Sequence, residues 1–208
     1  MTGLRERKKQ RTRETLIRTA IELFVEQGYE RTTVDEIAAA ADVSQRTFFR
    51  YFATKEEVAF ALQDMIESSF YEAVRRRPAE EPPPVALRAA LESVWDGIGT
   101  TIEDTVPVAT YTRMWRTIET TPALIAVALH RTTRMSELLA AEIARREGVD
   151  PDTDPRPRVL VAAFTAVMQA AARLWSTGDD ATLAGARAAT MAYLDQLPQA
   201  VGVWEPAR

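Results

Sequence analysis

The stretch from Thr33 to Glu57, TVDEIAAAADVSQRTFFRYFATKEE, decides the fold of this chain. Apolar residues recur at helical spacing over Val34–Ala41, which predicts a short helix there. Thr33 and Glu36 are placed to form a capping box, in which each side chain accepts a hydrogen bond from a backbone N–H at the helix start. The stretch therefore begins with a short helix whose first turn is fixed locally.

A second short helix follows after a turn of three residues, Asp42–Ser44. Ser44 is placed to cap a helix over Gln45–Phe52, and the spacing of Thr54 and Glu57 repeats the capping box and opens a third, longer helix. Two short helices that cross at a three-residue turn are the layout of a DNA-reading helix-turn-helix, whose second helix enters the major groove. The same layout also occurs as a purely structural unit inside helical bundles.

The second helix offers side chains that are suited to reading DNA. Phe48 and Phe52 lie four residues apart and continue the core, which leaves the opposite face for the groove. Glutamine suits adenine and arginine suits guanine, while hydroxyl groups and a lysine at a helix start suit phosphates. For each such side chain, a solvated helix face is the alternative. The predicted DNA contacts in this region are Thr33, Ser44, Gln45, Arg46, Thr47, Phe49, Arg50, Tyr51 and Lys55.

Positive charge is concentrated at the start of the chain. The whole chain has a net charge of −4, but residues 1–55 carry +3 and residues 56–208 carry −7. The first helix is expected to begin near Thr12, and we expect the basic arm before it to contact phosphates and to be disordered without DNA. A solvated tail without a function is the alternative. The predicted contacts of this arm are Arg5, Arg7, Lys8 and Lys9.

The helix-turn-helix and its flanks resemble a known family. The motif SQRTFFRYFATKEEV, preceded by LIRTAIELFVEQGYERTTVDEIA, is similar to the DNA-binding domain of TetR-family transcriptional regulators over roughly Thr12–Ala61. The resemblance implies a homodimeric regulator, most often a repressor, that leaves its operator when a small effector binds. Three positions depart from the family: Phe49 stands where tyrosine is usual, and Asp42 and Arg46 stand where glycine is common.

Helical spacing continues through the rest of the chain. We predict an all-α protein of about nine helices, with a three-helix DNA-binding domain over residues 1–54 and a helical ligand-binding and dimerisation domain over residues 55–208. A proline-rich segment at residues 78–84 marks a loop. The helices expected besides the two described above are Thr12–Gln27, Lys55–Arg77, Val85–Glu103, Val106–Thr120, Pro122–Glu147, Pro155–Ser176 and Ala181–Leu197.

Small apolar residues line the last two predicted helices. Alanine-rich faces let helices approach closely, and two such helices paired across a two-fold axis form a four-helix interface. The family resemblance implies a homodimer built in this way, whereas packing inside one chain is the alternative for each residue. The predicted interface consists of Val167, Ala170, Ala171, Leu174, Leu183, Ala186, Thr190, Tyr193 and Leu194.

Large, adaptable apolar side chains gather in the middle helices and are suited to line an effector cavity, with core packing as the alternative. The elements RMWRTIETTPAL and DPRPRVLVAAF resemble the C-terminal domain of mycofactocin-regulator-type TetR proteins. That resemblance implies an acyl-CoA-like effector, or another apolar ligand. The predicted pocket consists of Met65, Trp95, Ile98, Tyr111, Met114, Trp115, His130, Phe164 and Met168.

Other classes of function find little support in the sequence. The chain has no cysteine and a single histidine, which argues against zinc sites, disulfides and any resident metal or cofactor. It has neither Glu-x-x-His pairs nor a GxSxG motif, so we do not expect an enzyme. The longest apolar run, Val159–Ala172, is expected to be too short to span a bilayer, and we expect a cytoplasmic bacterial protein, bound to the nucleoid when on DNA. An effector-independent DNA-binding protein is the remaining alternative.

Overall fold

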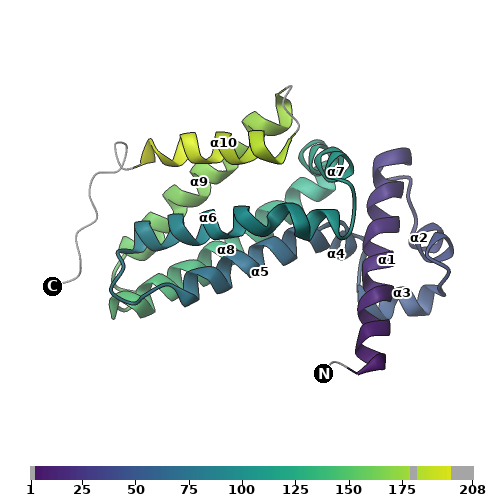
Figure 1. The fold of residues 1–208 in the computed structure, drawn as a ribbon, viewed down its shortest axis with the longest axis horizontal. Coiled ribbons are helices and arrows are strands. Elements are labelled where there is room, and N and C mark those ends of the chain that lie inside the picture. Colours follow the sequence, from purple (N-terminus) through teal and green to yellow (C-terminus); the bar gives the residue numbers. More distant parts are fainter. Residues whose placement is uncertain (1–2, 179–181, 198–208) are drawn as a thin grey trace. The chain divides into compact units, whose positions relative to one another are not determined.

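The computed structural model describes residues 3–178 and 182–197, which form helices and turns without a strand (Figure 1). This confirms the all-α prediction. The helices of the described residues are α1 (Leu4–Gln27), α2 (Val34–Ala40), α3 (Gln45–Tyr51), α4 (Lys55–Ala59), α5 (Ala61–Arg76), α6 (Pro83–Glu103), α7 (Val108–Thr120), α8 (Pro122–Glu147), α9 (Arg156–Thr177) and α10 (Leu183–Leu194).

The described residues contain ten helices rather than about nine, because the helix expected over Lys55–Arg77 is broken at Phe60. Phe60 has φ −97° and ψ 4°, and it separates α4 from α5. All residues from Val58 to Gln63 are buried. Six consecutive residues of a straight helix point to every side of its axis, so one straight helix buries all six only when it is surrounded. Because the chain changes direction at the break, all six side chains can be buried without a helix that is surrounded on every side.

The first helix begins earlier than the sequence suggested. We expected it to start near Thr12 after a disordered basic arm, but α1 already begins at Leu4, so the expectation was wrong for the described part of the arm. Residues 3–11 are exposed, and the Gln10 side chain donates a hydrogen bond of 2.8 Å to Glu14 within the helix. Arginine, lysine, glutamate and glutamine are all good helix formers, and no glycine or proline interrupts this segment.

Contacts between residues divide the chain into two compact units. The N-terminal unit comprises Met1–Met65 together with Thr100–Val127, so it combines α1–α4 with α7, and α1 packs against α2, α4 and α7. This division differs from the expected boundary after residue 54, because α7 belongs by its contacts to the unit that carries the helix-turn-helix. The buried core of the helix-turn-helix includes Leu16, Ile17, Ala20, Ile21, Phe24, Ile37 and Phe48.

The second compact unit comprises Ile66–Gly99 and the chain from Ala128 onwards. Its core is one apolar cluster to which α5, α6, α8, α9 and α10 all contribute. The rings of Phe70 and Phe164 stack within it, with centroids 5.8 Å apart and planes 4° apart. The buried members of this cluster are Val74, Leu87, Ala90, Leu91, Leu139, Ala140, Ile143, Leu160, Val161, Phe164 and Leu194.

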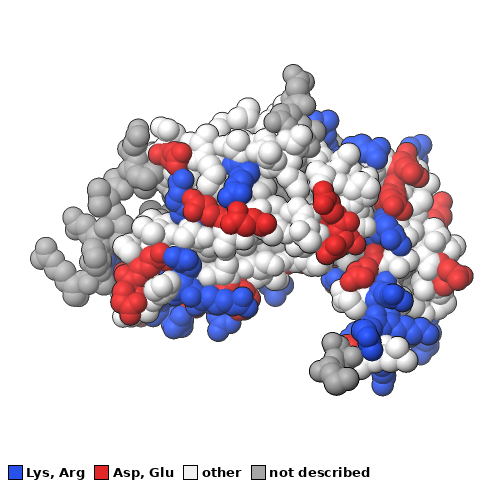
Figure 2. All heavy atoms as spheres, in the orientation of Figure 1, with Lys and Arg blue, Asp and Glu red and all other residues white. Residues whose placement is uncertain are grey.

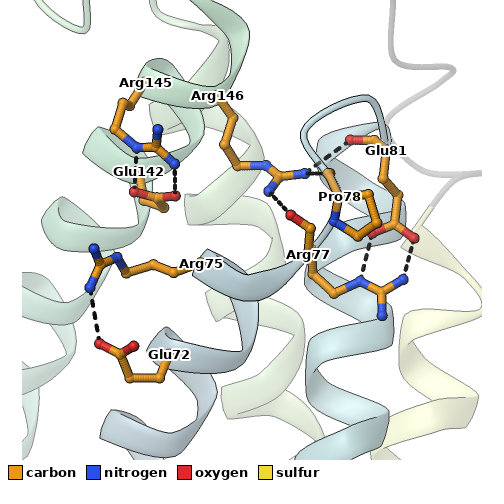
Figure 3. A network of polar contacts seen from close by, with 8 residues as sticks. All are labelled: Glu72, Arg75, Arg77, Pro78, Glu81, Glu142, Arg145 and Arg146. Carbon is orange, nitrogen blue, oxygen red and sulfur yellow. Dashed lines mark hydrogen bonds and ion pairs between the residues drawn. The ribbon is translucent and has the colours of Figure 1, made fainter.

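An arginine from α8 holds the loop between α5 and α6. The guanidinium of Arg146 donates hydrogen bonds to the backbone carbonyl oxygens of Arg77 at 3.0 Å, Pro78 at 2.5 Å and Glu81 at 3.3 Å (Figure 3). These carbonyls follow the end of α5, where the helix itself supplies no further N–H partners. Within the loop, Arg77 pairs with Glu81, and this hydrogen-bonded guanidinium lowers the pKa of the Glu81 carboxyl below its usual range.

Helix α9 is 22 residues long and, by length and composition alone, is apolar enough to cross a membrane. This differs from the expectation that its apolar run is too short. Leu160, Val161 and Phe164 lie in the core of the C-terminal unit. The core helix of a soluble protein meets the same criterion, so the length of α9 alone does not indicate a membrane protein.

Candidate DNA-binding interface

Local capping fixes the start of each short helix of the helix-turn-helix. At α2, the Thr33 hydroxyl accepts a hydrogen bond of 3.2 Å from the Glu36 N–H, and the Glu36 carboxylate accepts one of 2.7 Å from the Thr33 N–H. This confirms the predicted capping box. The backbone hydrogen bond from Thr33 is the main cause that lowers the pKa of the Glu36 carboxyl below its usual range.

The same chemistry fixes α3 and α4. Ser44 Oγ accepts a hydrogen bond of 3.1 Å from the Thr47 N–H, and the two hydroxyls of Ser44 and Thr47 lie 3.0 Å apart. At α4, Thr54 Oγ1 accepts from the Glu57 N–H at 3.2 Å, and Glu57 Oε2 accepts from the Ala53 N–H at 2.7 Å. Helix α3 is therefore held at both of its ends by short-range contacts before any DNA is present.

The turn between α2 and α3 depends on one unusual backbone conformation. Asp42 has φ +53°, in the left-handed region, and it is the one non-glycine residue with positive φ in the described chain. The Val43 N–H donates to the Ala38 carbonyl at 2.9 Å and completes the turn. Aspartate is among the few side chains that tolerate this region, so the turn forms without the glycine that is common at this position.

Helix α3 buries one face and exposes the other. Phe48 and Phe52 are buried in the core of the N-terminal unit. Gln45, Arg46 and Arg50 are exposed, and Phe49 is 48% exposed. Among the described residues, the side chains of Gln45 and Arg46 form no hydrogen bond or ion pair. Two long polar side chains thus lie on the outer face of a rigid helix with all their hydrogen-bonding groups available. This is what reading base edges in a major groove requires.

Lys55 occupies a different environment from the one predicted for a phosphate contact. Its ammonium donates 2.8 Å hydrogen bonds to the backbone carbonyl oxygens of Tyr29 and Thr32, and it lies 4.2 Å from the centre of the Tyr29 ring. The Tyr29 hydroxyl in turn donates a 2.7 Å hydrogen bond to Glu56. Lys55 therefore ties α4 to the turn between α1 and α2. Its contact with phosphate stays a prediction.

The position of Lys55 in the sequence is consistent with this role. Lys55 follows the N-cap Thr54, so its positive charge lies at the helix terminus that already carries a positive partial charge. A cation at that position needs compensating acceptors, which here are two backbone carbonyls. Partial burial is the main cause that lowers the pKa of the Lys55 ammonium below its usual range, opposed by the nearby Glu56 carboxylate.

The predicted basic contacts Arg5, Arg7, Lys8 and Lys9 are exposed on the first turns of α1. Figure 2 shows Lys and Arg side chains gathered around this end of the N-terminal unit. Further along α1, the Arg13 guanidinium lies 5.2 Å from the centre of the Phe52 ring, beyond the end of α3. A helical rather than disordered basic segment presents its charges at fixed spacing.

The predicted pocket residues are divided between the two units. Met65, Tyr111, Met114 and Trp115 belong to the N-terminal unit, and the others belong to the C-terminal unit. Buried indole nitrogens occur in both units: Nε1 of Trp95 and Nε1 of Trp115 have no hydrogen-bond partner within the described chain. His130 is exposed on α8. The pocket stays a prediction, and its remaining residues are Trp95, Ile98, Phe164 and Met168.

The predicted dimer residues also fall into distinct groups. Ala171, Ala186, Thr190 and Leu194 are buried within the C-terminal unit itself, and Val167 and Leu183 are partly buried. Ala170, Leu174 and Tyr193 are exposed, with Leu174 52% exposed. Further exposed apolar residues lie at helical spacing on the same two helices. They are Val159, Ala162 and Ala166 on α9 and Ala184, Ala188 and Ala192 on α10.

Comparison with protein families gives two matches along the chain. Residues 16–62 match the family of bacterial regulatory proteins named after TetR, and residues 81–198 match the MftR C-terminal domain. The first match contains the whole helix-turn-helix described above. The second covers more than half of the chain and most of its C-terminal unit.

Relatives with known names agree with this assignment. The regulator TcmR of Streptomyces glaucescens is 44% identical over 203 residues, which are 97% of this chain and 90% of TcmR. The mycofactocin biosynthesis transcriptional regulator MftR of Mycobacterium tuberculosis is 30% identical and covers 86% of this chain and 89% of its own length.

Solved structures show the same fold. The Thermus thermophilus TetR-family repressor FadR, in complex with lauroyl-CoA, aligns over 94% of this chain and 98% of its own, with a TM-score of 0.56 and 24% identity. A complex of SmeT with triclosan aligns over 95% and 96%, with a TM-score of 0.60 and 18% identity. Together with the capped helix-turn-helix, these matches show that the chain belongs to the TetR family of DNA-binding transcriptional regulators.

Proposed function

We propose that this regulator is a homodimeric repressor that occupies a palindromic operator and leaves it when a small apolar effector binds. The observation that carries the DNA-binding part is the outer face of α3, where Gln45 and Arg46 extend unpaired from a helix capped by Ser44. Arg46 suits the O6 and N7 atoms of guanine, and Gln45 suits the N6 and N7 atoms of adenine. The charged start of α1 adds phosphate contacts that do not depend on sequence.

A single short recognition helix reads too few bases for operator selectivity, which supports a dimer. The exposed apolar stripe of α9, which includes Val159 and Leu174, lies beside α10, whose exposed face includes Tyr193. Pairing this surface with its own copy across a two-fold axis forms a four-helix interface. The two α3 helices of such a dimer bind successive major grooves about 34–36 Å apart.

Effector release is supported by the relatives. FadR was solved with lauroyl-CoA and SmeT with triclosan, which makes an acyl-CoA or another apolar molecule a reasonable effector class for this chain. The chain passes from the N-terminal to the C-terminal unit within α5, between Met65 and Ile66, after the break at Phe60. An effector that favours one orientation of α4 then changes the position of α3, because Lys55 ties α4 to the turn between α1 and α2.

Coupling of this kind is reciprocal. If the effector weakens operator binding by a given factor, the operator weakens effector binding by the same factor, typically about 1–3 kcal/mol. Such a protein acts in the cytoplasm of a bacterial cell, at the chromosome. It needs no metal or cofactor for this function.

Footprinting of the DNA upstream of the protein's own gene tests the repressor reading. We expect protection of one short palindrome whose half-sites are centred about one helical turn, or a multiple of it, apart. The Arg46→Ala variant should protect the same region more weakly. Uniform, weak protection without a preferred site would instead support an effector-independent DNA-binding protein with little sequence preference.

A further inference from the structure

We propose that residues 97–101 form a hinge within α6, and that bending there lets the change of shape that releases the operator pass from the C-terminal to the N-terminal unit. The role of this hinge rests on the effector-released repressor proposed above. Two observations carry it: the place where α6 passes between the two compact units, and the residues that stand there.

The chain passes between the two compact units three times, each time inside a helix. It crosses in α5 after Met65, in α6 after Gly99 and in α8 after Val127. About one turn of each of these helices therefore belongs to the N-terminal unit. A change in the C-terminal unit reaches the N-terminal unit through the backbone of these three helices.

Helix α6 changes composition just before its crossing. Its sequence is PPVALRAALESVWDGIGTTIE, in which Gly-Ile-Gly-Thr-Thr occupies positions 97–101. Glycine has the lowest helix propensity after proline, and isoleucine and threonine are weaker helix formers than the alanines and leucines that precede them. Neither α5 nor α8 contains a glycine. Of the three crossing helices, α6 is therefore the one with the least resistance to bending near its crossing.

Neither glycine of this segment is required by the fold. Both lie within α6, which continues to Glu103, and neither has the positive φ that favours glycine. A Cβ atom at Gly97 would meet nothing within 4 Å outside the adjoining backbone. One at Gly99 would meet only the Leu183 side chain, at 3.8 Å, which is an ordinary contact. Two glycines that weaken a helix without serving space or backbone conformation are explained by bending at this place.

Both ends of the segment are anchored. Before it, Leu91 lies in the apolar core cluster of the C-terminal unit, and Asp96 forms an ion pair of 2.9 Å with Arg187 of α10. After it, Ile102 is buried in the N-terminal unit, and its carbonyl oxygen accepts a 2.9 Å hydrogen bond from the Val106 N–H. A change in the direction of α6 is therefore concentrated in residues 97–101.

The segment leads directly to the helices that carry the DNA-binding residues. The chain continues from α6 into α7, which begins at Val108 and packs against α1. Helix α1 in turn packs against α2, the first helix of the helix-turn-helix. Bending at residues 97–101 therefore moves α7, and with it α1. Hinges of this kind consist of a few residues, often small ones, that absorb a change in backbone direction.

The test measures how widely a distance across the hinge varies in the full chain. The chain has no cysteine, so Glu26→Cys on α1 and Glu137→Cys on α8, both exposed, take spin labels at two places only. Double electron–electron resonance in an excess of unlabelled protein reports distances within one chain. The stiffened variant is Gly97→Ala combined with Gly99→Ala. The control is Ser93→Ala, an exposed change that also favours the helix but lies one turn before the hinge.

We expect a broad distance distribution for the wild type and for Ser93→Ala, and a clearly narrower one for the stiffened variant. The melting temperature of the stiffened variant should rise by about 2–4 °C for each glycine replaced, because alanine favours the helix. Equal distribution widths in the wild type and the stiffened variant would show a fixed helix and overturn the hinge. A lower melting temperature would show that packing requires the glycines, and would overturn it too.

Operator release tests the role of the hinge. Of lauroyl-CoA and triclosan, whichever displaces the wild type from its operator should be needed at about tenfold higher concentration for the stiffened variant, within the usual range of coupling between sites. Equal concentrations for the two proteins would overturn this role. If neither ligand displaces the wild type, the effector-released repressor fails for these ligands, while the distance distributions still decide whether α6 bends.

Discussion

The ammonium of Lys55 and the ring of Tyr29 are in contact, with the nitrogen 4.2 Å from the ring centre, while the same ammonium donates a hydrogen bond to the Tyr29 carbonyl oxygen. Lys55 begins α4, and Tyr29 follows α1. The contact therefore joins α4 to the turn between α1 and α2. It stabilises the N-terminal unit by holding these two elements together.

Replacing Lys55 by methionine should destabilise the protein in the absence of DNA. The change removes a cation–π contact and two hydrogen bonds to backbone carbonyls, a loss of about 2–4 kcal/mol. For a chain of this size we expect the melting temperature to fall by roughly 5–10 °C in a thermal scan. An unchanged melting temperature together with weaker DNA binding would contradict this account and favour a pure phosphate contact.

The Tyr29→Phe variant tests the second half of the same contact. It keeps the ring beneath Lys55 but removes the hydroxyl that donates to Glu56 at 2.7 Å. Because this hydrogen bond reaches a carboxylate, we expect a loss of about 1–3 kcal/mol in unfolding free energy. Tyr51→Phe, on α3 of the same unit, is the matched control in the absence of DNA, because no described residue forms a hydrogen bond with the Tyr51 hydroxyl. Equal melting curves for the two variants would show that the Tyr29 hydroxyl contributes nothing.

Arg46→Ala should relax operator selectivity at one base position. If Arg46 forms paired hydrogen bonds to a guanine, the loss is about 1–3 kcal/mol on the preferred operator and close to zero on an operator changed at that base. Selection of binding sites from a random pool, for the wild type and the variant, measures this directly. Arg113→Ala, on the exposed face of α7, is the control. A uniform loss on all sequences would assign Arg46 to phosphate instead.

The charged start of α1 should contribute without regard to sequence. Replacing Arg5, Arg7, Lys8 and Lys9 by alanine removes four exposed positive charges while keeping good helix formers. We expect weaker binding to every DNA and a less steep dependence on salt, by up to about 0.9 in the logarithmic slope for each lost phosphate contact. Loss of affinity for the operator alone would contradict a phosphate-binding role.

Acid should destabilise the C-terminal unit through Glu142. The hydrogen-bonded guanidinium of Arg145 is the main cause that lowers the pKa of this carboxyl below its ordinary value of 4.5. A group whose pKa is lowered by folding stabilises the folded state above its unfolded pKa and loses that contribution as the pH falls through the folded pKa. Unfolding by denaturant should therefore show a decline in stability below about pH 4.5 that is smaller in Glu142→Gln. An identical pH dependence in the two proteins would count against this pair.

The dimer surface can be tested by one charge on α9. Val159 is 62% exposed in the single chain, so Val159→Glu should leave the fold intact but place a carboxylate in the proposed interface. Light scattering at micromolar concentration should show a dimer for the wild type and a monomer for the variant. A dimer in both proteins would exclude this part of α9 from the interface.

The sequence predicted the features that depend on neighbouring residues. The capping of α2 by Thr33 and Glu36 and of α3 by Ser44 follows from side chains three residues apart, and the structure has all of these contacts. The burial of Phe48 and Phe52 follows from helical spacing in the same way. Such features were accessible because no distant part of the chain decides them.

Other features depend on packing that a single sequence does not display. The break at Phe60 has no glycine or proline to announce it and arises where six consecutive residues are buried. The role of Lys55 depends on carbonyls more than twenty residues away. On α9, Ala170 and Ala171 look alike in the sequence, but Ala170 is exposed and Ala171 is buried.

The most direct test of the central claim is the electrophoretic mobility of the DNA upstream of this gene, mixed with the protein at moderate salt with and without lauroyl-CoA or triclosan. The account predicts one discrete shifted band on this DNA, absent from unrelated DNA of equal length, that one of the two apolar ligands abolishes and free coenzyme A does not. A shift of equal strength on unrelated DNA, indifferent to both ligands, would contradict an effector-released repressor.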